Sequence, residues 1–364
     1  MKNLFCLNLF ITLLLCSCNS NKSTMEEHPL LMMDNYNLSS IKNKLSEIFK
    51  TYKLVQLETN DSCLIGGRGN KIVKHNSIFY ILSQNTILRF DKEGNYINKL
   101  AQTGSGPEDY VSIFDFDVLT LNETDEIWLS TVGGIKIYDA KTCLFKRMIP
   151  INGFVNQFKY VNNSTILVIC PEDTIFKVCN TDGSTRYKFL EKDVANSGHK
   201  FNQFFSFQNK LIYQLDDTQT GVVYDIDKDS IYCQNIIDAK DKLLTPKINQ
   251  EYYDRFGYEN QTVKVAENYI RTSTIRTLRD KVFMTQFYPD GDKTITIYTN
   301  GISEKYSYGT GTKIENDIMQ TKDLEFLSTI ICSEGDDSII FMIPSDIIAG
   351  HEEEDNPCLL EVYV

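Results

Sequence analysis

The stretch SIFYILSQNTILRFDKEGNYINKL (residues 77–100) contains three apolar runs separated by two polar turns. The runs are rich in Ile, Phe, Tyr and Leu, a composition that favours short strands. The turns contain Gln84-Asn85 and Asp91 to Gly94, residue types that reverse the direction of a chain. The stretch therefore predicts three consecutive antiparallel strands.

The same pattern recurs further along the chain. Each copy has an apolar run, an acidic or amide turn and a run that doubles back, and the copies lie at 135–149, 175–190, 222–237 and 294–308. A module of short antiparallel strands repeated along a chain is the signature of a β-propeller. Alignment by the turns gives six modules, the last of which ends one strand short.

These modules predict an all-β fold, a six-bladed β-propeller with four-stranded antiparallel blades. The sixth module stops at Val364 after its third strand, whereas the alternating run at 51–58 precedes the first module and has no partner there. We expect this N-terminal strand to complete the last blade and close the ring, because closure leaves no open sheet edge.

The first 17 residues have the features of a signal peptide. Lys2 is their only charge, and residues 4–15 form an apolar run too short for a stable membrane span. The run ends in Leu15-Cys16-Ser17-Cys18, which resembles the bacterial lipobox, where a cysteine is acylated after cleavage. We expect lipid on Cys18; the alternative is an ordinary secretory peptide that leaves this cysteine unmodified.

The remaining chain divides into three parts. Residues 18–38 are polar with little periodicity and predict a tether, 39–50 predict a short helix, and 51–364 predict a single propeller domain. The net charge of −12 argues against nucleic-acid partners, because an acidic surface repels phosphate backbones. The cysteines left after residue 18 are odd in number and irregularly spaced, which predicts neither a disulfide framework nor a zinc cluster.

The lengths of the predicted connections differ between the two faces of the propeller. Turns between first and second strands are tiny, whereas the longest connections would share one face: 101–112, 191–202, 238–272, 310–327 and 344–357. Long loops on one face are typical of a binding surface. We call this predicted surface the long-loop face and expect it to contact a glycan, a peptide or a protein partner.

The turn at 104–110, GSGPEDY, superficially matches a phosphate-binding loop. That interpretation fails because Pro107 lacks a backbone donor and no Lys-Ser/Thr follows into a helix. A tight junction between two blades fits the residues better. It would present Asp109 and Tyr110 to the long-loop face as candidate ligand contacts.

The segment 238–272 carries aromatic and polar side chains together. Tyr252, Tyr253 and Arg255 suit stacking on a sugar or peptide, and the alternative is a flap whose aromatic rings pack on the blade beneath it. Arg68, just before the first blade, is a further basic candidate near the channel mouth.

Histidine and acidic residues also map to the long-loop face. His199, His351 and Glu352 could supply ligands for Ca²⁺ or another divalent ion, and a solvated acidic loop is the alternative. No other cofactor is indicated. A metal in the channel would make the chain a lyase or hydrolase rather than a binding module.

Several motifs occur in an order that is similar to the six-bladed β-propeller lipoproteins of Bacteroidota, a family of mostly unassigned function. They read YKLVQLET (52–59), CLIG (63–66), FDKEGNYI (90–97), GSGPEDY (104–110), IIDAKDK (236–242) and DNPCLLEVY (355–363). The Gly-rich turn also resembles the blade junction of NHL-type propellers. The resemblance implies a propeller bound by lipid to the outer membrane, on its periplasmic or its surface side. The leading function is a binding or scaffold module, and a metal-dependent enzyme is the alternative.

Overall fold

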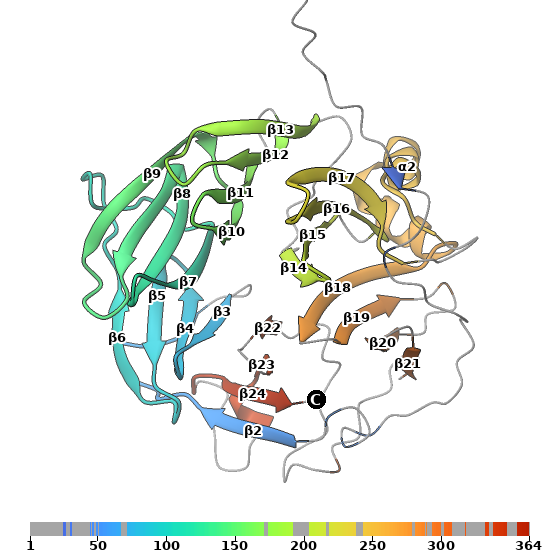
Figure 1. Cartoon of the computed structure of the whole chain (residues 1–364). Helices are drawn as coiled ribbons and strands as arrows, with labels where there is room; N and C mark the ends of the chain where they lie inside the picture. Colours follow the sequence, from blue (N-terminus) through green and yellow to red (C-terminus); the bar gives the residue numbers. More distant parts are fainter. Residues whose placement is uncertain are drawn as a thin grey trace, which may run out of the picture.

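The computed structural model describes most of the chain from Thr51 onward. The described residues are 25–26, 30, 44, 46, 49, 51–66, 71–170, 174–191, 204–215, 218–237, 243–278, 281–287, 289, 293–299, 302–307, 317, 332–334, 338–347 and 355–363. Their strands form six sheets arranged around a common centre (Figure 1). With one exception, β1, neighbouring strands are antiparallel, so the predicted all-β class is confirmed.

The first three sheets follow one another along the chain. Sheet 1 contains β3 (Ile72–His75), β4 (Ile78–Ser83), β5 (Thr86–Phe90) and β6 (Tyr96–Leu100). Sheet 2 contains β7 (Asp115–Leu121), β8 (Thr124–Asp139) and β9 (Phe145–Phe154). Sheet 3 contains β10 (Gln157–Asn162), β11 (Thr165–Cys170), β12 (Thr174–Cys179) and β13 (Thr185–Glu191).

The last three sheets include two strands from the N-terminal region. Sheet 4 contains β14 (Phe204–Phe207), β15 (Lys210–Gln214), β16 (Thr220–Asp225), β17 (Ser230–Asn235) and β1 (Met25–Glu26). Sheet 5 contains β18 (Arg271–Leu278), β19 (Lys281–Phe287), β20 (Lys293–Thr299) and β21 (Ile302–Ser307). Sheet 6 contains β22 (Cys332–Glu334), β23 (Ile339–Ile343), β24 (Cys358–Tyr363) and β2 (Thr51–Gln56).

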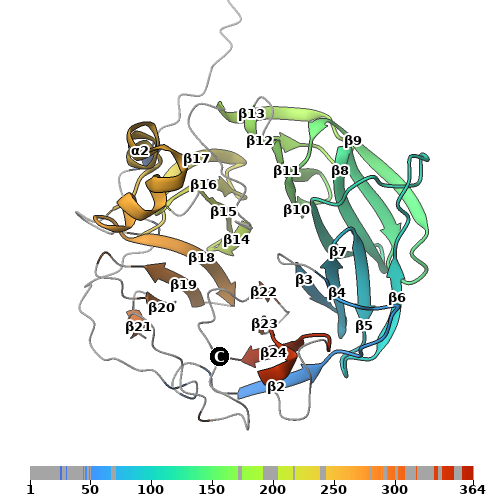
Figure 2. The same cartoon turned by 180° about the vertical axis from the view of Figure 1, so that it is seen from behind.

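Each sheet begins at the centre and continues outward in chain order, as both views show, except that β1 and β2 are added at the outer edges of sheets 4 and 6 (Figures 1 and 2). In sheet 6 the outermost strand is β2, which pairs antiparallel with β24 from Thr51 opposite Tyr363 to Gln56 opposite Cys358. The first strand of the domain and the last strand of the chain therefore belong to one sheet.

The apolar core lies between neighbouring sheets. Between sheets 1 and 2, for example, Tyr80, Phe116, Ile127 and Tyr138 pack together and are all buried. Similar clusters join sheet 2 to 3, sheet 3 to 4, sheet 4 to 5 and sheet 6 to 1. Burying a side chain of this size contributes about 1.5–3 kcal/mol, so each cluster holds two sheets face to face.

Glycines in the turns between third and fourth strands allow successive sheets to approach closely. Gly94 and Gly183 both have φ +91°, a conformation that other residues rarely adopt. A Cβ atom at either position would collide with a backbone oxygen of the preceding sheet, at Gln56 and Pro150 respectively. The two turns thus occupy equivalent places in the repeat.

The separate strands predicted at 125–131 and 135–138 both lie within β8. The chain reverses between them at Gly133 and Gly134, which have positive φ, so that Ala140 N donates to Asp125 O at 2.9 Å. Two segments differ from the sequence expectation. The segment 238–272, expected as a loop, contains α2 (Pro246–Ala266). Part of the expected tether forms β1. A short 3-10 helix, Ser345–Ile347, completes the described elements.

The helix α2 has signals in its sequence that the loop prediction overlooked. Thr245 is its N-cap, with a side chain that accepts a hydrogen bond from Ile248 N at 3.3 Å, and Pro246 follows in the first turn. A Thr-Pro pair in these positions is typical of a helix start. Gly257, with φ +73°, kinks the helix. Of the helix expected at 39–50, the structure describes three residues, among them the buried Phe49.

Candidate functional site

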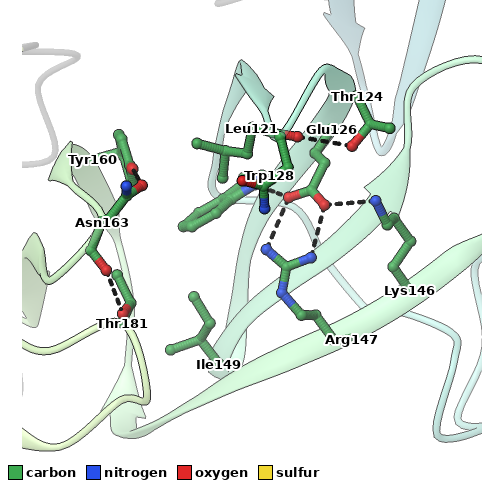
Figure 3. A pocket seen from close by; sticks show the side chains of 11 residues that line it. Leu121, Thr124, Glu126, Trp128, Lys146, Arg147, Ile149, Tyr160, Asn163 and Thr181 are labelled. Carbon is green, nitrogen blue, oxygen red and sulfur yellow. Dashed lines mark hydrogen bonds and ion pairs between the residues drawn. The ribbon is translucent and has the colours of Figure 1, made fainter.

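A pocket of about 520 Å³ lies between sheets 2 and 3 (Figure 3). Its walls come from β8 and β9 of sheet 2, from β10 of sheet 3, and from the short turns that follow β7, β10 and β12. These turns are of the class that the sequence places opposite the long-loop face. We call this site the Glu126 pocket, after the carboxylate at its base.

Glu126 is buried, with 3% of its surface exposed, and four donors surround its two oxygens. Arg147 donates to both, from Nη1 to Oε1 at 2.7 Å and from Nη2 to Oε2 at 2.8 Å. Lys146 Nζ lies 2.7 Å from Oε1, and Trp128 Nε1 donates to Oε2 at 3.0 Å. Side chains of the protein itself thus supply hydrogen-bond donors to both carboxylate oxygens.

The electrostatics of Glu126 follow from these contacts. Burial by itself raises the pKa of a carboxyl group, but the hydrogen bonds from Arg147, Lys146 and Trp128 outweigh it and lower the pKa of Glu126 below its usual value. The group is ionised at neutral pH. Its role is to fix the directions of two cationic side chains rather than to act as a base.

The remaining walls of the pocket present further donors. The side chains of Lys146 and Arg147 keep 32% and 45% of their surfaces exposed. Across the pocket, Tyr160 donates its hydroxyl hydrogen to Asn163 Oδ1 at 2.6 Å, so the amide Nδ2 of Asn163 can donate to a ligand. The Arg147 guanidinium also lies 5.8 Å from the ring centre of Trp128, a cation–π contact that holds its plane.

A second pocket, of about 470 Å³, lies between sheets 6 and 1. It is bounded by the end of β2, by Glu58 and Thr59, and by the turn at Gly94 and Asn95. Glu58 accepts hydrogen bonds from Tyr96 N at 2.8 Å and from Asn60 at 2.7 Å. Because it has carboxylates and no cation among its lining residues, it is chemically unlike the Glu126 pocket.

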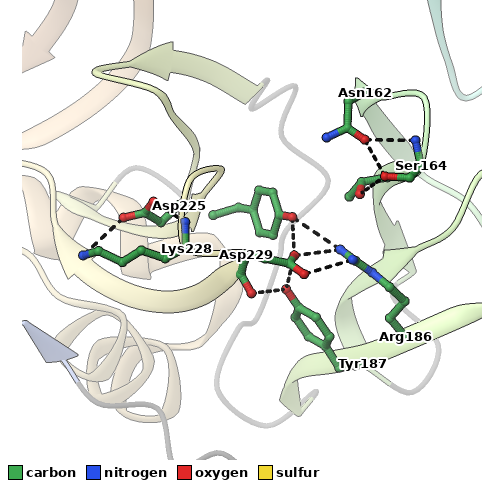
Figure 4. A network of polar contacts seen from close by, with 9 residues as sticks. Asn162, Ser164, Arg186, Tyr187, Asp225, Lys228 and Asp229 are labelled. Atoms are coloured by element: carbon green, nitrogen blue, oxygen red, sulfur yellow. Dashed lines mark hydrogen bonds and ion pairs between the residues drawn. The ribbon is translucent and has the colours of Figure 1, made fainter.

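A polar network joins sheets 3 and 4 (Figure 4). Arg186 donates to both carboxylate oxygens of Asp229, at 3.0 and 2.8 Å, and the hydroxyl groups of Tyr224 and Tyr187 also donate to Asp229. The hydrogen bond from Tyr224 lowers the pKa of Asp229, with further support from Arg186. All four side chains are engaged with one another, so the network acts as a clamp between two sheets.

Charged pairs also connect the innermost strands. Lys71 Nζ lies 2.7 Å from Asp115 Oδ1, and Lys159 Nζ lies 3.4 Å from Asp117 Oδ2. Burial raises the pKa of Asp115 despite the neighbouring Lys71, whereas for Asp117 the attraction of Lys159 and Lys71 outweighs burial and lowers the pKa. Phe158 N donates to Asp115 at 3.3 Å, which ties sheet 3 to sheet 2.

Asp109 and Tyr110, predicted as ligand contacts, lie in the junction between sheets 1 and 2. Asp109 Oδ2 accepts a hydrogen bond from Gly106 N at 3.1 Å, and the backbone oxygen of Asp109 accepts one from Lys136. Tyr110 is 1% exposed, and its hydroxyl donates to Leu100 O at 3.0 Å. Burial raises the pKa of Tyr110 to about 12. These contacts account for both side chains as parts of the junction.

Tyr252, Tyr253 and Arg255 lie on α2. The ring of Tyr252 packs against Phe256 and Tyr269, at 5.5 and 5.8 Å between centroids, whereas Tyr253 and Arg255 are exposed. The helix follows sheet 4, so the structure brings these three residues together but places them on a different element from Asp109 and Tyr110.

The other predicted site residues lie outside the described part of the chain: Cys18, Arg68, His199, His351 and Glu352. Within the described ranges no group of three or more His, Cys, Asp or Glu side chains could hold a metal ion. The six cysteines that the structure describes as free are buried. Among the described helices, none is long and apolar enough to cross a membrane.

Sequence reasoning missed the Glu126 pocket. One signal was present, because Glu126 and the single tryptophan, Trp128, are two residues apart in a predicted strand and therefore share a face. Lys146 and Arg147 lie about 20 residues further along the chain, on β9. Nothing in their spacing from Glu126 identifies them as its partners. A buried tryptophan flanked by a carboxylate is the only local cue.

The described sheets, packed in succession around a centre, place the chain in the β-propeller-like class. A family model described as a domain of unknown function, DUF4934, matches residues 32–362. The chain therefore belongs to the DUF4934 family. None of the curated proteins matches the chain.

Solved structures share the fold at low sequence identity. A Bacteroides fragilis protein named provisionally as exported has a TM-score of 0.69 and 17% identity, covering 93% of this chain and 99% of that one. A DUF4221 member from Bacteroides vulgatus has a TM-score of 0.56 and 11% identity, covering 85% and 96%. The β-propeller domain of Cps50 (Swd1) from Myceliophteria thermophila is more distant, at a TM-score of 0.39 and 9% identity over 76% and 80%.

Proposed function

We propose that this chain is an exported binding propeller, held at the outer membrane by lipid on Cys18. The six sheets would be its six blades, and β2 would complete the last blade and close the ring. Six consecutive residue pairs between β2 and β24 support this closure. Two observations support export and membrane attachment: the lipobox-like sequence, and the fold shared with a Bacteroides fragilis protein named as exported.

The binding site that the described residues support best is the Glu126 pocket. The observation that carries this proposal is the saturation of Glu126 by its own neighbours, which leaves the outward donors of Lys146, Arg147 and Asn163 for a ligand. One negative and two positive charges give the pocket a net positive charge. We propose a ligand that bears a carboxylate, because a planar anion can accept from the guanidinium and the ammonium at once.

The ligand would be small or would enter as an end group, since the pocket holds about 520 Å³. An acidic sugar and an acidic peptide side chain both supply the required carboxylate. The net charge of −12 on the whole chain disfavours a nucleic acid. The long-loop face, with Tyr253 and Arg255 exposed on α2, stays a predicted second surface for a glycan, a peptide or a protein partner.

Isothermal titration calorimetry tests this site. Glucuronate is compared with glucose, its neutral counterpart, and N-acetylglutamate represents a peptide side chain. We expect binding of at least one of the two acids and none of glucose. Lys146→Gln should weaken that binding about tenfold or more, because one charge-assisted hydrogen bond is lost.

The matched control is Lys92→Gln, an exposed lysine in the turn before Gly94 that lies 3.5 Å from Glu93 and outside the pocket. It should leave the affinity unchanged. Failure of both acids to bind at millimolar concentration would reject the pocket as a carboxylate site. Equal weakening by Lys92→Gln would show that only overall charge matters.

The alternative function, a lyase or hydrolase with a divalent ion in the channel, stays a prediction. Its candidate ligands His199, His351 and Glu352 lie outside the described residues. On the inner strand β7, Asp115 and Asp117 are each paired with a lysine. No observation on the described part of the chain favours this function over binding.

A further inference from the structure

The N-terminal segment of the chain docks on the outer edge of sheet 4. Met25 and Glu26 form β1, which runs parallel to β17 with Met25 opposite Cys233 and Glu26 opposite Gln234. Further along, Leu30 N donates to Asn235 O at 2.9 Å. Because β17 would otherwise be the last strand of its sheet, these residues cover an edge whose backbone groups need partners.

Leu30 adds an apolar contact to this backbone pairing. It packs, partly buried, against the cluster between sheets 4 and 5, which includes Tyr232, Ile236 and Ile237. A side chain that enters an inter-sheet core fixes the register of the segment, since backbone hydrogen bonds alone would permit a slip along β17. The docking therefore rests on two kinds of contact.

The insertion that contains α2 is attached at the same end of β17. Gln219 is fully buried; its Oε1 accepts from Leu244 N at 2.6 Å and its Nε2 donates to Ile270 O at 2.7 Å, so it joins both ends of the insertion. The backbone oxygen of Gln219 accepts from Ile236 N at 2.6 Å. The N-terminal segment and the helix thus share one edge of the molecule.

Docking changes how far the domain can move from a lipid on Cys18. Met25 is the seventh residue after Cys18, a span of at most about 25 Å, whereas Thr51 is the thirty-third, a span of up to about 115 Å. A compact domain of about 310 residues has a radius of gyration near 20 Å. A free tether would let any surface reach the bilayer, but a docked one would not.

From this arrangement we infer that the edge formed by β17 and α2 faces the lipid headgroups, and that the docked segment sets this orientation. The inference rests on the proposed lipid at Cys18. β1 runs parallel to β17, so Met25 lies nearer than Glu26 to the Ser230 end of that strand. Exposed Tyr253 and Arg255 on α2 suit the interfacial region, where aromatic rings and guanidinium groups are favoured.

This orientation leaves the Glu126 pocket accessible. The pocket lies between sheets 2 and 3, on the other side of sheet 3 from the docked edge. Sheet 1 lies across the centre of the molecule from sheet 4 in both views (Figures 1 and 2). In this orientation Val263, 61% exposed on α2, lies on the edge near the lipid headgroups. Ile97, 43% exposed on β6, lies on the edge far from them.

Hydrogen exchange on the unlipidated chain beginning at residue 19 tests the docking by itself. Leu30→Asp should speed exchange of amides in 230–237, because the segment is released from β17. Leu64→Asp, at a leucine that is 52% exposed, is the matched control and should leave those amides unchanged. Unaltered exchange in Leu30→Asp would overturn the docking.

Energy transfer to acceptor-labelled vesicles tests the orientation with the lipidated chain. A donor dye is placed on Val263→Cys or on Ile97→Cys, and the unsubstituted chain is labelled in parallel to measure background. We expect transfer at least about twofold higher from position 263, given a domain roughly 50 Å across, and equal transfer once Leu30→Asp is added. Equal transfer with the native segment would overturn the orientation.

The two possible failures are distinguishable. Intact-mass measurement shows whether Cys18 carries lipid, and Cys18→Ala should release the protein from membranes. If neither holds, the proposed anchor is wrong and the orientation falls with it. The exchange experiment needs no lipid, so it still decides whether Met25, Glu26 and Leu30 dock on β17.

Discussion

Replacement of the buried carboxylate, Glu126→Gln, is the sharpest test of the pocket geometry. The variant keeps the shape of the side chain but removes the charge that accepts two hydrogen bonds from Arg147 and a contact from Lys146. Hydrogen bonds to a charged group contribute about 1.5–3 kcal/mol each. Because Arg147 is nearly half exposed, water replaces part of the lost hydrogen bonding. We therefore expect the free energy of unfolding to fall by about 2–3 kcal/mol.

The expected loss converts into a melting shift. A domain of about 310 residues unfolds with an entropy near 0.65 kcal/mol per kelvin, so a loss of about 2.5 kcal/mol lowers Tm by roughly 4 °C. Differential scanning calorimetry at pH 7 measures this shift. Glu93→Gln, at an exposed carboxylate 3.5 Å from Lys92, is the control and should change Tm by less than about 1 °C.

The pH dependence of the same variant gives an independent check. The pKa of Glu126 is lower in the folded state than in the unfolded chain, so its stabilisation is complete above the unfolded value, about 4.3. It declines as pH falls through the folded value. The Tm difference between wild type and Glu126→Gln should therefore shrink below about pH 4. A Tm shift under about 1 °C at pH 7, or one that grows in acid, would refute the geometry.

Three further predictions concern the fold. Gly183→Ala should cost about 2–4 kcal/mol, because φ +91° strains any side chain and a Cβ would meet the backbone of Pro150; urea unfolding measures this. Gln219→Leu should leave the ends of the α2 insertion without their buried partners, and limited proteolysis should cut α2 several-fold faster than in wild type. Tyr110 should remain protonated to about pH 11, given its pKa of about 12, so Tyr110→Phe should leave the ultraviolet phenolate titration below that pH unchanged.

The repeat could be identified from sequence because its signals are local. Apolar runs and turn residues such as Asp91 and Gly94 indicate strand and reversal without knowledge of any distant residue. The same kind of local signal marks α2, because Thr245 and Pro246 form a helix start within the segment expected as a loop.

The candidate site depended on contacts that no local pattern encodes. Tyr110 is of a residue type that is common in ligand sites, yet the packing of sheet 1 against sheet 2 buries it. Glu126 and Arg147 belong to different strands of sheet 2, and Asn163 comes from the next sheet. Their convergence depends on the pairing of β8 with β9 and on the placement of sheet 3 beside them.

By itself, the sequence of this chain determined the all-β class, the repeating antiparallel module and most strand positions, since alternation and turn chemistry act over a few residues. Only the tertiary structure decided which side chains meet between sheets, where the cationic pocket lies, and that Met25, Glu26 and Leu30 contact sheet 4 along β17. The reason is physical: contacts between sheets depend on how entire sheets pack against one another, and one apolar run carries no information about its neighbour's surface.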